Sequence, residues 1–200
     1  MPSLEPGPLG DCTAIIVAHD ETTSTTLLSL AQRVGFGQVT TASEPLYPLM
    51  FFLVHFGIGR AAKEKLIQQI RATASPLVQL APIILFAPDG PYDRLLEYIE
   101  MGFDDVIFLP EKRHVLAARL AAQVDQEHIY IETGSYLGPD RRRMELPGHT
   151  HPNRGSGSFE HKRLTVLRKV DSGPQIVRTQ LFLKQNHEAP KHALTGRRTA

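Results

Sequence analysis

The chain has 200 residues and a formal net charge of +1, a length that fits one domain of common size with a small second unit. No apolar run approaches the ~20 residues of a membrane-spanning helix, and the N-terminus lacks the basic start and apolar stretch of a secretion signal. We therefore expect a cytoplasmic protein without a membrane partner. A single cysteine, Cys12, excludes an internal disulfide and a cysteine-rich zinc site.

The small net charge hides two chemically different regions. Residues 1–139 carry 9 Lys and Arg against 16 Asp and Glu, a net charge of −7, whereas residues 140–200 carry 13 against 5, a net charge of +8. The change falls at Gly138-Pro139-Asp140, a turn-prone sequence that leads directly into three arginines. The C-terminal region is therefore expected to differ from the rest in its contacts.

Residues 13–124 alternate short β-branched apolar runs with amphipathic stretches of helical period, which is typical of parallel strands joined by crossover helices. The predicted strands are 14–17, 38–42, 51–56, 82–86 and 106–109, and the predicted helices are 22–34, 60–73, 91–101 and 111–124. Pro45 and Pro48 would leave any helix before the third strand short or distorted. Five such units predict an α/β fold with a five-stranded, doubly wound parallel sheet of the flavodoxin-like type.

In such a sheet a ligand site lies outside the carboxyl ends of the strands. The residues that the sequence places there are His19, Asp20, His55, Ala87 and Leu109. No glycine-rich phosphate loop follows the first strand, which argues against a dinucleotide or nucleoside triphosphate enzyme.

Residues 15–21, 82–87 and 101–110 resemble stretches of response-regulator receiver domains, the CheY-like family. Ile15-Ile16-Val17-Ala18-His19-Asp20-Glu21 is similar to the first strand of the family with its acidic pair, and Pro82-Ile83-Ile84-Leu85-Phe86-Ala87 to the fourth strand. Met101-Gly102-Phe103-Asp104-Asp105-Val106-Ile107-Phe108-Leu109-Pro110 is similar to the Gly-x-Asp-Asp stretch that leads to the Lys-Pro of the family. The resemblance covers residues 13–124 and implies a role in bacterial two-component or phosphorelay signal transduction.

Carried over position by position, the resemblance implies that most active residues of a receiver are missing. The metal-binding acid pair is His19-Asp20, the phosphoacceptor aspartate is His55, the hydroxyl residue of the fourth strand is Ala87, and the lysine before the proline is Leu109. Only Asp20 is retained. An active receiver holds Mg²⁺ through clustered carboxylates and stabilises the phosphoryl group through lysine and hydroxyl. The resemblance therefore implies a degenerate pseudo-receiver that is not an enzyme, is not phosphorylated on aspartate and has no cofactor or metal site.

Several of these residues allow more than one interpretation. His55 and His19 could form a phosphohistidine or transition-metal site, or they could be neutral histidines that fill a pocket without its former chemistry. Asp20 could hold a weak cation or cap the first helix. Asp104 and Asp105 are interpreted as turn residues and not as paired catalytic carboxylates. The Leu109-Pro110 peptide corresponds to one that is usually cis in the family.

Without phosphorylation, the binding face of a receiver remains. In the family this face comprises the fourth helix, fifth strand and fifth helix, which correspond here to residues 93–101, 106–108 and 111–124. Aromatic, Met and Arg side chains are enriched at interfaces, so the candidate partner contacts are Tyr92, Tyr98, Met101, Lys112, Arg113 and Arg119. Tyr98 and Met101 could instead complete the buried stripe of their helix.

The remaining segments are divided by composition. Residues 1–12 form a leader, 13–124 the receiver-like domain, 125–146 an extension with a strand-like run at 128–133, 147–160 a flexible linker, 161–185 a β-hairpin and 186–200 a disordered tail. The basic cluster Arg141, Arg142 and Arg143 could contact nucleic acid, an acidic protein partner or the acidic receiver-like unit itself. A lone hairpin is only marginally stable, so it should pack on the receiver-like unit, on a second copy of the chain or on the sheet of a partner.

Two functions compete at this level. The first is a non-catalytic adaptor that binds a protein partner of a signalling complex and could also self-associate. The alternative is a nucleic-acid-binding regulator that uses the basic C-terminal region, although that region has no helix-turn-helix pattern and few aromatic residues for base stacking. A third option, an active phosphoreceiver that uses His55, predicts label uptake that depends on this histidine.

Overall fold

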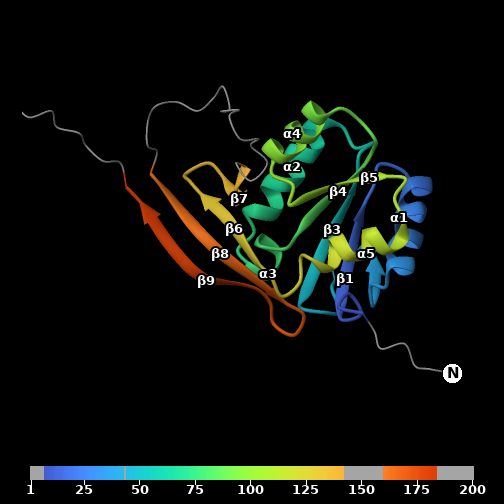
Figure 1. The fold of residues 1–200 in the computed structure, drawn as a ribbon, viewed down its shortest axis with the longest axis horizontal. Helices are drawn as coiled ribbons and strands as arrows, with labels where there is room; N and C mark the ends of the chain where they lie inside the picture. Colours follow the sequence, from blue (N-terminus) through green and yellow to red (C-terminus); the bar gives the residue numbers. More distant parts are fainter. Residues whose placement is uncertain (1–6, 43, 142–159, 184–200) are drawn as a thin grey trace, which may run out of the picture.

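The computed structural model describes residues 7–42, 44–141 and 160–183, except for the side chain of Tyr92. Two β-sheets, one parallel and one antiparallel, organise the molecule (Figure 1). The predicted tail at 186–200 and nearly all of the predicted linker lie outside the described residues.

The first sheet has five parallel strands, which are β1 (Cys12–Val17), β2 (Gln38–Thr40), β3 (Leu49–His55), β4 (Ile83–Pro88) and β5 (Asp105–Leu109). Their order is β2-β1-β3-β4-β5, which is the order of flavodoxin-like, CheY-like doubly wound sheets. The fold class predicted from the strand and helix pattern is therefore confirmed.

The helices connecting these strands are α1 (Glu21–Val34), α2 (Arg60–Arg71), α3 (Pro76–Gln79), α4 (Tyr92–Met101) and α5 (Arg113–Ala121). The short helix α3 was not predicted; it begins with proline at its first position, where the missing N–H costs no helical hydrogen bond. Helix α5 ends at Ala121, three residues before the predicted end, because Gln123 and Val124 continue it only with i→i+3 hydrogen bonds.

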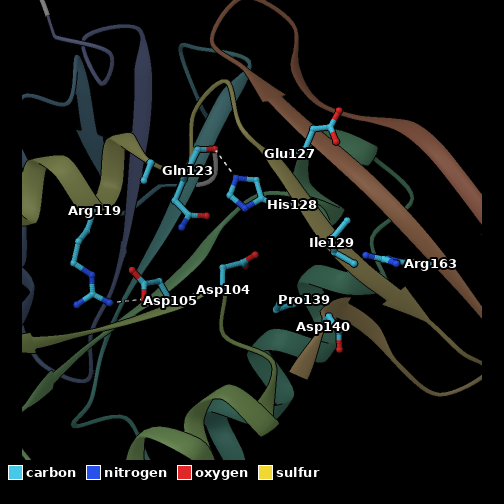
Figure 2. Close-up of a pocket in the computed structure, with 11 residues that line it drawn as sticks. Asp104, Asp105, Arg119, Gln123, Glu127, His128, Ile129, Pro139, Asp140 and Arg163 are labelled. Carbon is cyan, nitrogen blue, oxygen red and sulfur yellow. Dashed lines mark hydrogen bonds and ion pairs between the residues drawn. The ribbon is translucent and has the colours of Figure 1, made fainter. Parts of the chain in front are cut away.

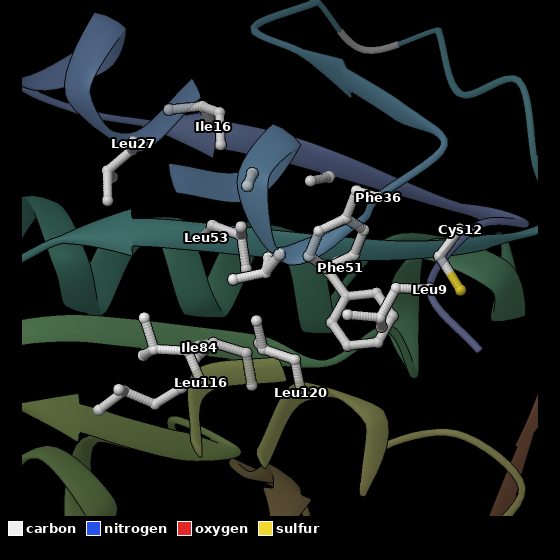
Figure 3. Packing of buried hydrophobic residues seen from close by; sticks show 14 of the residues in the cluster. Leu9, Cys12, Ile16, Leu27, Phe36, Phe51, Leu53, Ile84, Leu116 and Leu120 are labelled. Carbon is white, nitrogen blue, oxygen red and sulfur yellow. The ribbon is translucent and has the colours of Figure 1, made fainter. Parts of the chain in front are cut away.

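Buried side chains cover both faces of the parallel sheet. On one face, Leu27 of α1 and Leu116 of α5 pack against strand residues such as Phe51 (Figure 3). The ring of Phe51 also meets Phe36 edge to face, with 5.1 Å between ring centroids. On the other face, residues of α2 and α4 pack on the alternate side chains of β3 and β4. This coverage explains why the strands read as near-continuous apolar runs and not as alternating ones.

The second sheet has four antiparallel strands, which are β6 (Glu127–Glu132), β7 (Leu137–Pro139), β8 (His161–Lys169) and β9 (Gly173–Phe182). Their order is β7-β6-β8-β9. The predicted C-terminal hairpin is therefore present as β8 and β9. It extends a sheet of its own chain, because β8 pairs with β6 from Glu132↔Lys162 to Glu127↔Leu167.

The second sheet packs against the end of the parallel sheet where the strands begin. Its Tyr130, Leu164 and Val166 form a buried cluster with Leu80, which lies shortly before β4. The turn into β9 also approaches this end, because a Cβ on Gly173 would lie 2.8 Å from the backbone oxygen of Pro48, just before β3. The sequence left open what the hairpin packs on, and the receiver-like unit is one of its neighbours.

Asp104 lies at a bend between α4 and β5, as the turn interpretation has it, but its side chain is buried in a charged network. Asp105 corrects that interpretation, because it is a strand residue. The buried carboxylate of Asp104 lies between two buried arginines, with Arg168 Nη2 at 2.7 Å from Oδ1 and Arg71 Nη2 at 2.6 Å from Oδ2. Tyr130 donates its hydroxyl to the same carboxylate at 2.5 Å, and the backbone N–H of Ile83 donates at 2.8 Å. Asp105 is the first residue of β5, and it pairs with Arg119.

Arg168 makes this network a junction between the two sheets. It comes from β8, and it also donates to the backbone oxygen of Leu80 and to the side chain of Gln123. Burial alone would raise the pKa of Asp104, but Arg168 and Arg71 lower it by more than burial raises it, so the pKa lies well below its ordinary value. The carboxylate therefore stays ionised when the protein is folded.

We expect Asp104→Asn to destabilise the protein by about 3–5 kcal/mol, because two buried guanidinium groups lose their counter-charge. Asp105→Asn is the matched control; its ion pair with Arg119 is partly exposed, so the loss should be at most about 1 kcal/mol. Urea unfolding of the two variants would measure both values. Equal losses would contradict a special role for Asp104.

The same pair of variants tests the pH dependence of stability. Because the pKa of Asp104 is lower in the folded chain than in the unfolded chain, its contribution is present above the unfolded value of about 3.9 and is lost as the pH falls below it. Unfolding free energy measured from pH 7 downwards should thus fall more steeply for wild type than for Asp104→Asn. Parallel curves for the two proteins would contradict this assignment.

Candidate functional site

The residues that the sequence assigned to the strand ends gather at the carboxyl end of the parallel sheet. His19 and Asp20 follow β1, and His55 is the last residue of β3. The rings of His19 and His55 are stacked, with 5.4 Å between centroids and 17° between planes. Ala87 is buried in the apolar cluster under α2 and α4, and Leu109 packs against the cluster on the opposite face. Ala87 and Leu109 are therefore apolar side chains in apolar surroundings.

Asp20 is the N-cap of α1. Its Oδ1 accepts a hydrogen bond from the backbone N–H of Thr23 at 2.8 Å, and its Oδ2 lies 2.5 Å from Nε2 of His19. The hydrogen bond from Thr23 is the main reason that the pKa of Asp20 lies below its ordinary value. The predicted capping role is confirmed, and the one carboxylate retained from the receiver pattern is already engaged by its own helix.

His55 is a half-buried histidine whose Nδ1 accepts a hydrogen bond from the backbone N–H of Gly57 at 3.2 Å. Burial lowers its pKa below the ordinary value, and His19 lowers it further. The neutral imidazole is favoured near pH 7, with the proton on Nε2 because Nδ1 is an acceptor. Gly57 permits this packing, since a Cβ there would lie 2.6 Å from Cε1 of His19 and 3.0 Å from Nδ1 of His55.

Lys63 is a cation beside this pocket that the sequence interpretation missed. It lies on α2, it is almost fully buried, and its Nζ stands 5.2 Å from the ring centroid of Tyr98. Burial lowers its pKa, and its charge contributes to the low pKa of His55. The signal was present in the sequence, because Lys63 falls on the same helical stripe as Ile67 and Ile70.

Two absences are observed within the described part of the chain. Residues 7–42, 44–141 and 160–183 contain no group of three or more His, Cys, Asp or Glu side chains placed to hold a metal ion. None of the helices in these ranges has the length and apolar character needed to cross a bilayer.

Some of the residues predicted for the partner face are engaged by contacts within the chain, and others are exposed. Tyr98 and Met101 are half-buried against the apolar cluster under α2 and α4, and Tyr98 meets Phe103 edge to face. Arg119 is engaged by Asp105 at 2.5 Å and by the backbone oxygen of Val106 at 2.9 Å. Lys112 and Arg113, at the start of α5, are exposed. The side chain of Tyr92 is not among those described, so the two exposed cations are the clearest contact candidates.

Only one member of the predicted basic cluster is described. The guanidinium of Arg141 stands 3.7 Å from the ring centroid of Tyr136, so it stacks on its own extension, and the residue is exposed. Arg142 and Arg143 lie outside the described residues.

A cavity of about 570 Å³ lies between α5 and the second sheet (Figure 2). Its lining residue Asp105 begins β5, whereas His55 ends β3, so the cavity and the histidines lie at opposite ends of the parallel sheet. The wall of the cavity combines two arginines, Arg119 and Arg163, with acidic residues from the receiver-like domain and from the segment that forms the second sheet. The acidic lining residues are Asp104, Asp105, Glu127 and Asp140, and His128 lies among them. Sequence analysis did not indicate this cavity, because its wall is assembled from segments far apart in the chain. Its mixed charge favours no single class of ligand.

No protein-family model matches the chain, and no curated protein matches it. Among solved structures, it is similar to the signal receiver domain of a signal transduction histidine kinase from Syntrophus aciditrophicus, with 20% sequence identity and a TM-score of 0.39. That similarity covers 57% of this chain and 92% of the other. The fold assignment rests on the strand order and not on this similarity.

We expect His55 to titrate below the ordinary histidine pKa of about 6.5, because burial and His19 both disfavour its charged form. His19→Ala should raise this pKa, since it removes the neighbouring imidazole. Imidazole proton shifts followed by NMR from about pH 4 to about pH 8 would give the pKa of His55 in the wild type and in His19→Ala. An unchanged or lower midpoint in His19→Ala would contradict the electrostatic coupling of the two rings.

Proposed function

We propose that this chain is a non-catalytic pseudo-receiver that acts as a protein-protein interaction adaptor in bacterial signal transduction. The observation that supports it most is the state of His55. At the position where the receiver resemblance requires a phosphoacceptor aspartate, this residue is a stacked, hydrogen-bonded imidazole. The signalling context is inferred from the sequence resemblance, and the strand order is compatible with it.

Receiver chemistry requires groups that this pocket does not supply. A carboxylate must attack the phosphodonor, further carboxylates must hold Mg²⁺, and a lysine and a hydroxyl must stabilise the charge that develops on the phosphoryl oxygens. Here the nearby carboxylate of Asp20 caps α1, and Ala87 and Leu109 have no polar side-chain atom. Lys63 is directed to the ring of Tyr98.

We assign the adaptor role to the start of α5 and to α4, the two helices of the predicted partner face. Lys112 and Arg113 are exposed there, whereas Arg119 further along α5 is held by Asp105. Rim cations of this kind act on the rate of association with an acidic partner more than on the final affinity. A partner with an acidic surface therefore fits this face best.

The second candidate function is nucleic-acid binding. It is favoured by the net charge of +8 in residues 140–200, counted as 13 Lys and Arg against 5 Asp and Glu. Part of this charge is neutralised within the chain, because Arg168 is buried on Asp104 and Lys162 pairs with Glu132 at 3.0 Å. Binding to phosphates should weaken steeply with salt, which separates it from the adaptor role.

We expect the full chain to take up no phosphoryl group from acetyl phosphate in the presence of Mg²⁺. The reason is that the pocket holds neither an acceptor aspartate nor a lysine on β5. Intact-mass spectrometry at neutral pH would detect the added mass, with an active receiver as the positive control. A phosphorylated product that disappears in His55→Ala would contradict the pseudo-receiver and would support histidine chemistry.

We expect a charge reversal on the α5 face, Lys112→Glu with Arg113→Glu, to abolish recovery of the partner from native cells at near-physiological salt. The variant should fold, because acidic residues at a helix N-terminus are favourable. Lys65→Glu, which changes an exposed cation of α2, is the matched control and should retain the partner.

Parallel purifications with nuclease, and with Arg141, Arg142 and Arg143 replaced by Ser, separate the two functions. A protein retained after nuclease and lost from the α5 variant would support the adaptor. Material that disappears on nuclease treatment would make nucleic-acid binding the leading function. Material that disappears only in the Ser variant would place the contact on the basic cluster.

A further inference from the structure

Strand β9 forms one edge of the second sheet. It is ten residues long, it pairs with β8 from Gly173 to Phe182 except at Val177, and no strand of the described residues pairs with its other side. From Gln175 to Leu183 every described residue is exposed. One side of its backbone therefore presents peptide groups that are available for a further strand.

The exposed apolar side chains of the protein concentrate on this strand. Among the described residues, eight large hydrophobic side chains are exposed, and five of them belong to β9 or to the residue after it. These five are Ile176, Val177, Leu181, Phe182 and Leu183, with exposed fractions between 43% and 62%. Apolar side chains scattered singly are normal on a surface, whereas here Leu181, Phe182 and Leu183 follow one another at the end of the strand.

The usual protection of an edge strand is weak here. Natural edges carry lysines, prolines or bulges that discourage pairing. In β9 the proline, Pro174, lies at the very start, and the irregularity in the ladder leaves Val177 unpaired between Ile176 and Arg178. From Arg178 to Phe182 the ladder is regular, and Arg178 is the only charged residue of the strand. This regular half can accept a neighbouring strand.

We propose that β9 pairs antiparallel with β9 of a second copy of this chain, which joins the two antiparallel sheets into one. Two identical strands that pair in this way are related by a two-fold axis, so the contact is closed and does not propagate. A second copy is favoured over a different partner because the strand is apolar and nearly neutral, and because it meets its own copy without a charge conflict.

The sequence of β9 selects the register of this pairing. When two identical strands pair antiparallel, the residue numbers of every opposed pair add up to the same value. The two side chains of a pair must also lie on the same face of the sheet. An axis through Arg178 would oppose two arginines, and an axis through Leu181 would oppose Arg178 and Lys184. Like charges directly opposite each other are destabilising. An axis through Gln180 avoids both conflicts.

With the axis at Gln180, the pairs are Arg178 with Phe182, Thr179 with Leu181, and Gln180 with its own copy. The faces agree, because Arg178 and Phe182 lie opposite Thr165 and His161 of β8, two positions of one face, and Thr179 and Leu181 lie opposite Leu164 and Lys162 of the other. An axis at Thr179 would instead pair Ile176 with Phe182, which the irregularity at Val177 places on opposite faces. Guanidinium over an aromatic ring and amide beside amide are both favourable cross-strand pairs.

Sedimentation velocity of the full chain over a range of concentrations tests the dimer. Gln180→Lys would place two ammonium groups opposite each other on the axis, so we expect it to weaken the dimer about tenfold or more. Gln175→Lys makes the same exposed substitution in the same strand away from the axis, and it should change the dimer dissociation constant by less than about twofold. Far-UV circular dichroism and melting temperature would show that both variants fold.

A cysteine cross-link gives an independent readout. Gln180→Cys should form an intermolecular disulfide under mild oxidation, whereas Gln175→Cys should not, and the native Cys12 is buried with a pKa raised by burial to about 12. A wild-type chain that stays monomeric up to about 0.1 mM would overturn the proposal. A dimer that Gln180→Lys does not weaken would also overturn it. The dimer does not depend on the adaptor role, because it involves neither the histidine pocket nor α5.

Discussion

The position of the second sheet depends on one buried carboxylate. Asp104 lies in the segment between α4 and β5, and it accepts hydrogen bonds from Arg71 of α2 and Arg168 of β8 while Tyr130 of β6 donates to it. Two buried guanidinium groups share this one carboxylate, so any displacement of the second sheet would leave at least one buried charge without its partner. Such a loss is far more costly than the loss of an exposed ion pair. The network therefore fixes the relative placement of two sheets that hydrophobic contact alone would constrain less specifically.

The two ends of the parallel sheet differ in the side chains that cover them. The amino ends of β3, β4 and β5 are covered by the second sheet through Pro48, Leu80 and Asp104. The carboxyl ends, where flavodoxin-like folds hold their ligands, carry the stacked imidazoles and the helix cap. The buried network at the amino ends is compatible with the proposed adaptor, which would present its surfaces in one conformation.

The sequence predicted the parts of the structure that depend on local pattern. The carboxyl ends of parallel strands meet at one edge of the sheet, so the sequence pattern alone places His19 near His55. The Asp104 network could not be predicted in this way, because Arg71 and Arg168 lie 33 and 64 positions from Asp104. A charged residue on an otherwise apolar stripe was the available hint, and Lys63 and Arg71 of α2 both show it. The pairing of β6 with β8 could not be predicted either, because an alternating pattern indicates a strand but does not indicate which strand it pairs with.

Strands β7 and β8 belong to the same sheet, although residues 140–160 separate them in sequence. Both ends of this connection are therefore anchored, one at β7 beside β6 and the other at β8, which Arg168 holds to the receiver-like unit. The entropy of closing a loop between fixed ends grows only with the logarithm of its length, by about 0.6 kcal/mol for each doubling. In evolutionary terms, changes in the number of residues between Pro139 and His161 should therefore cost the fold little as long as β7 and β8 keep their pairings with β6.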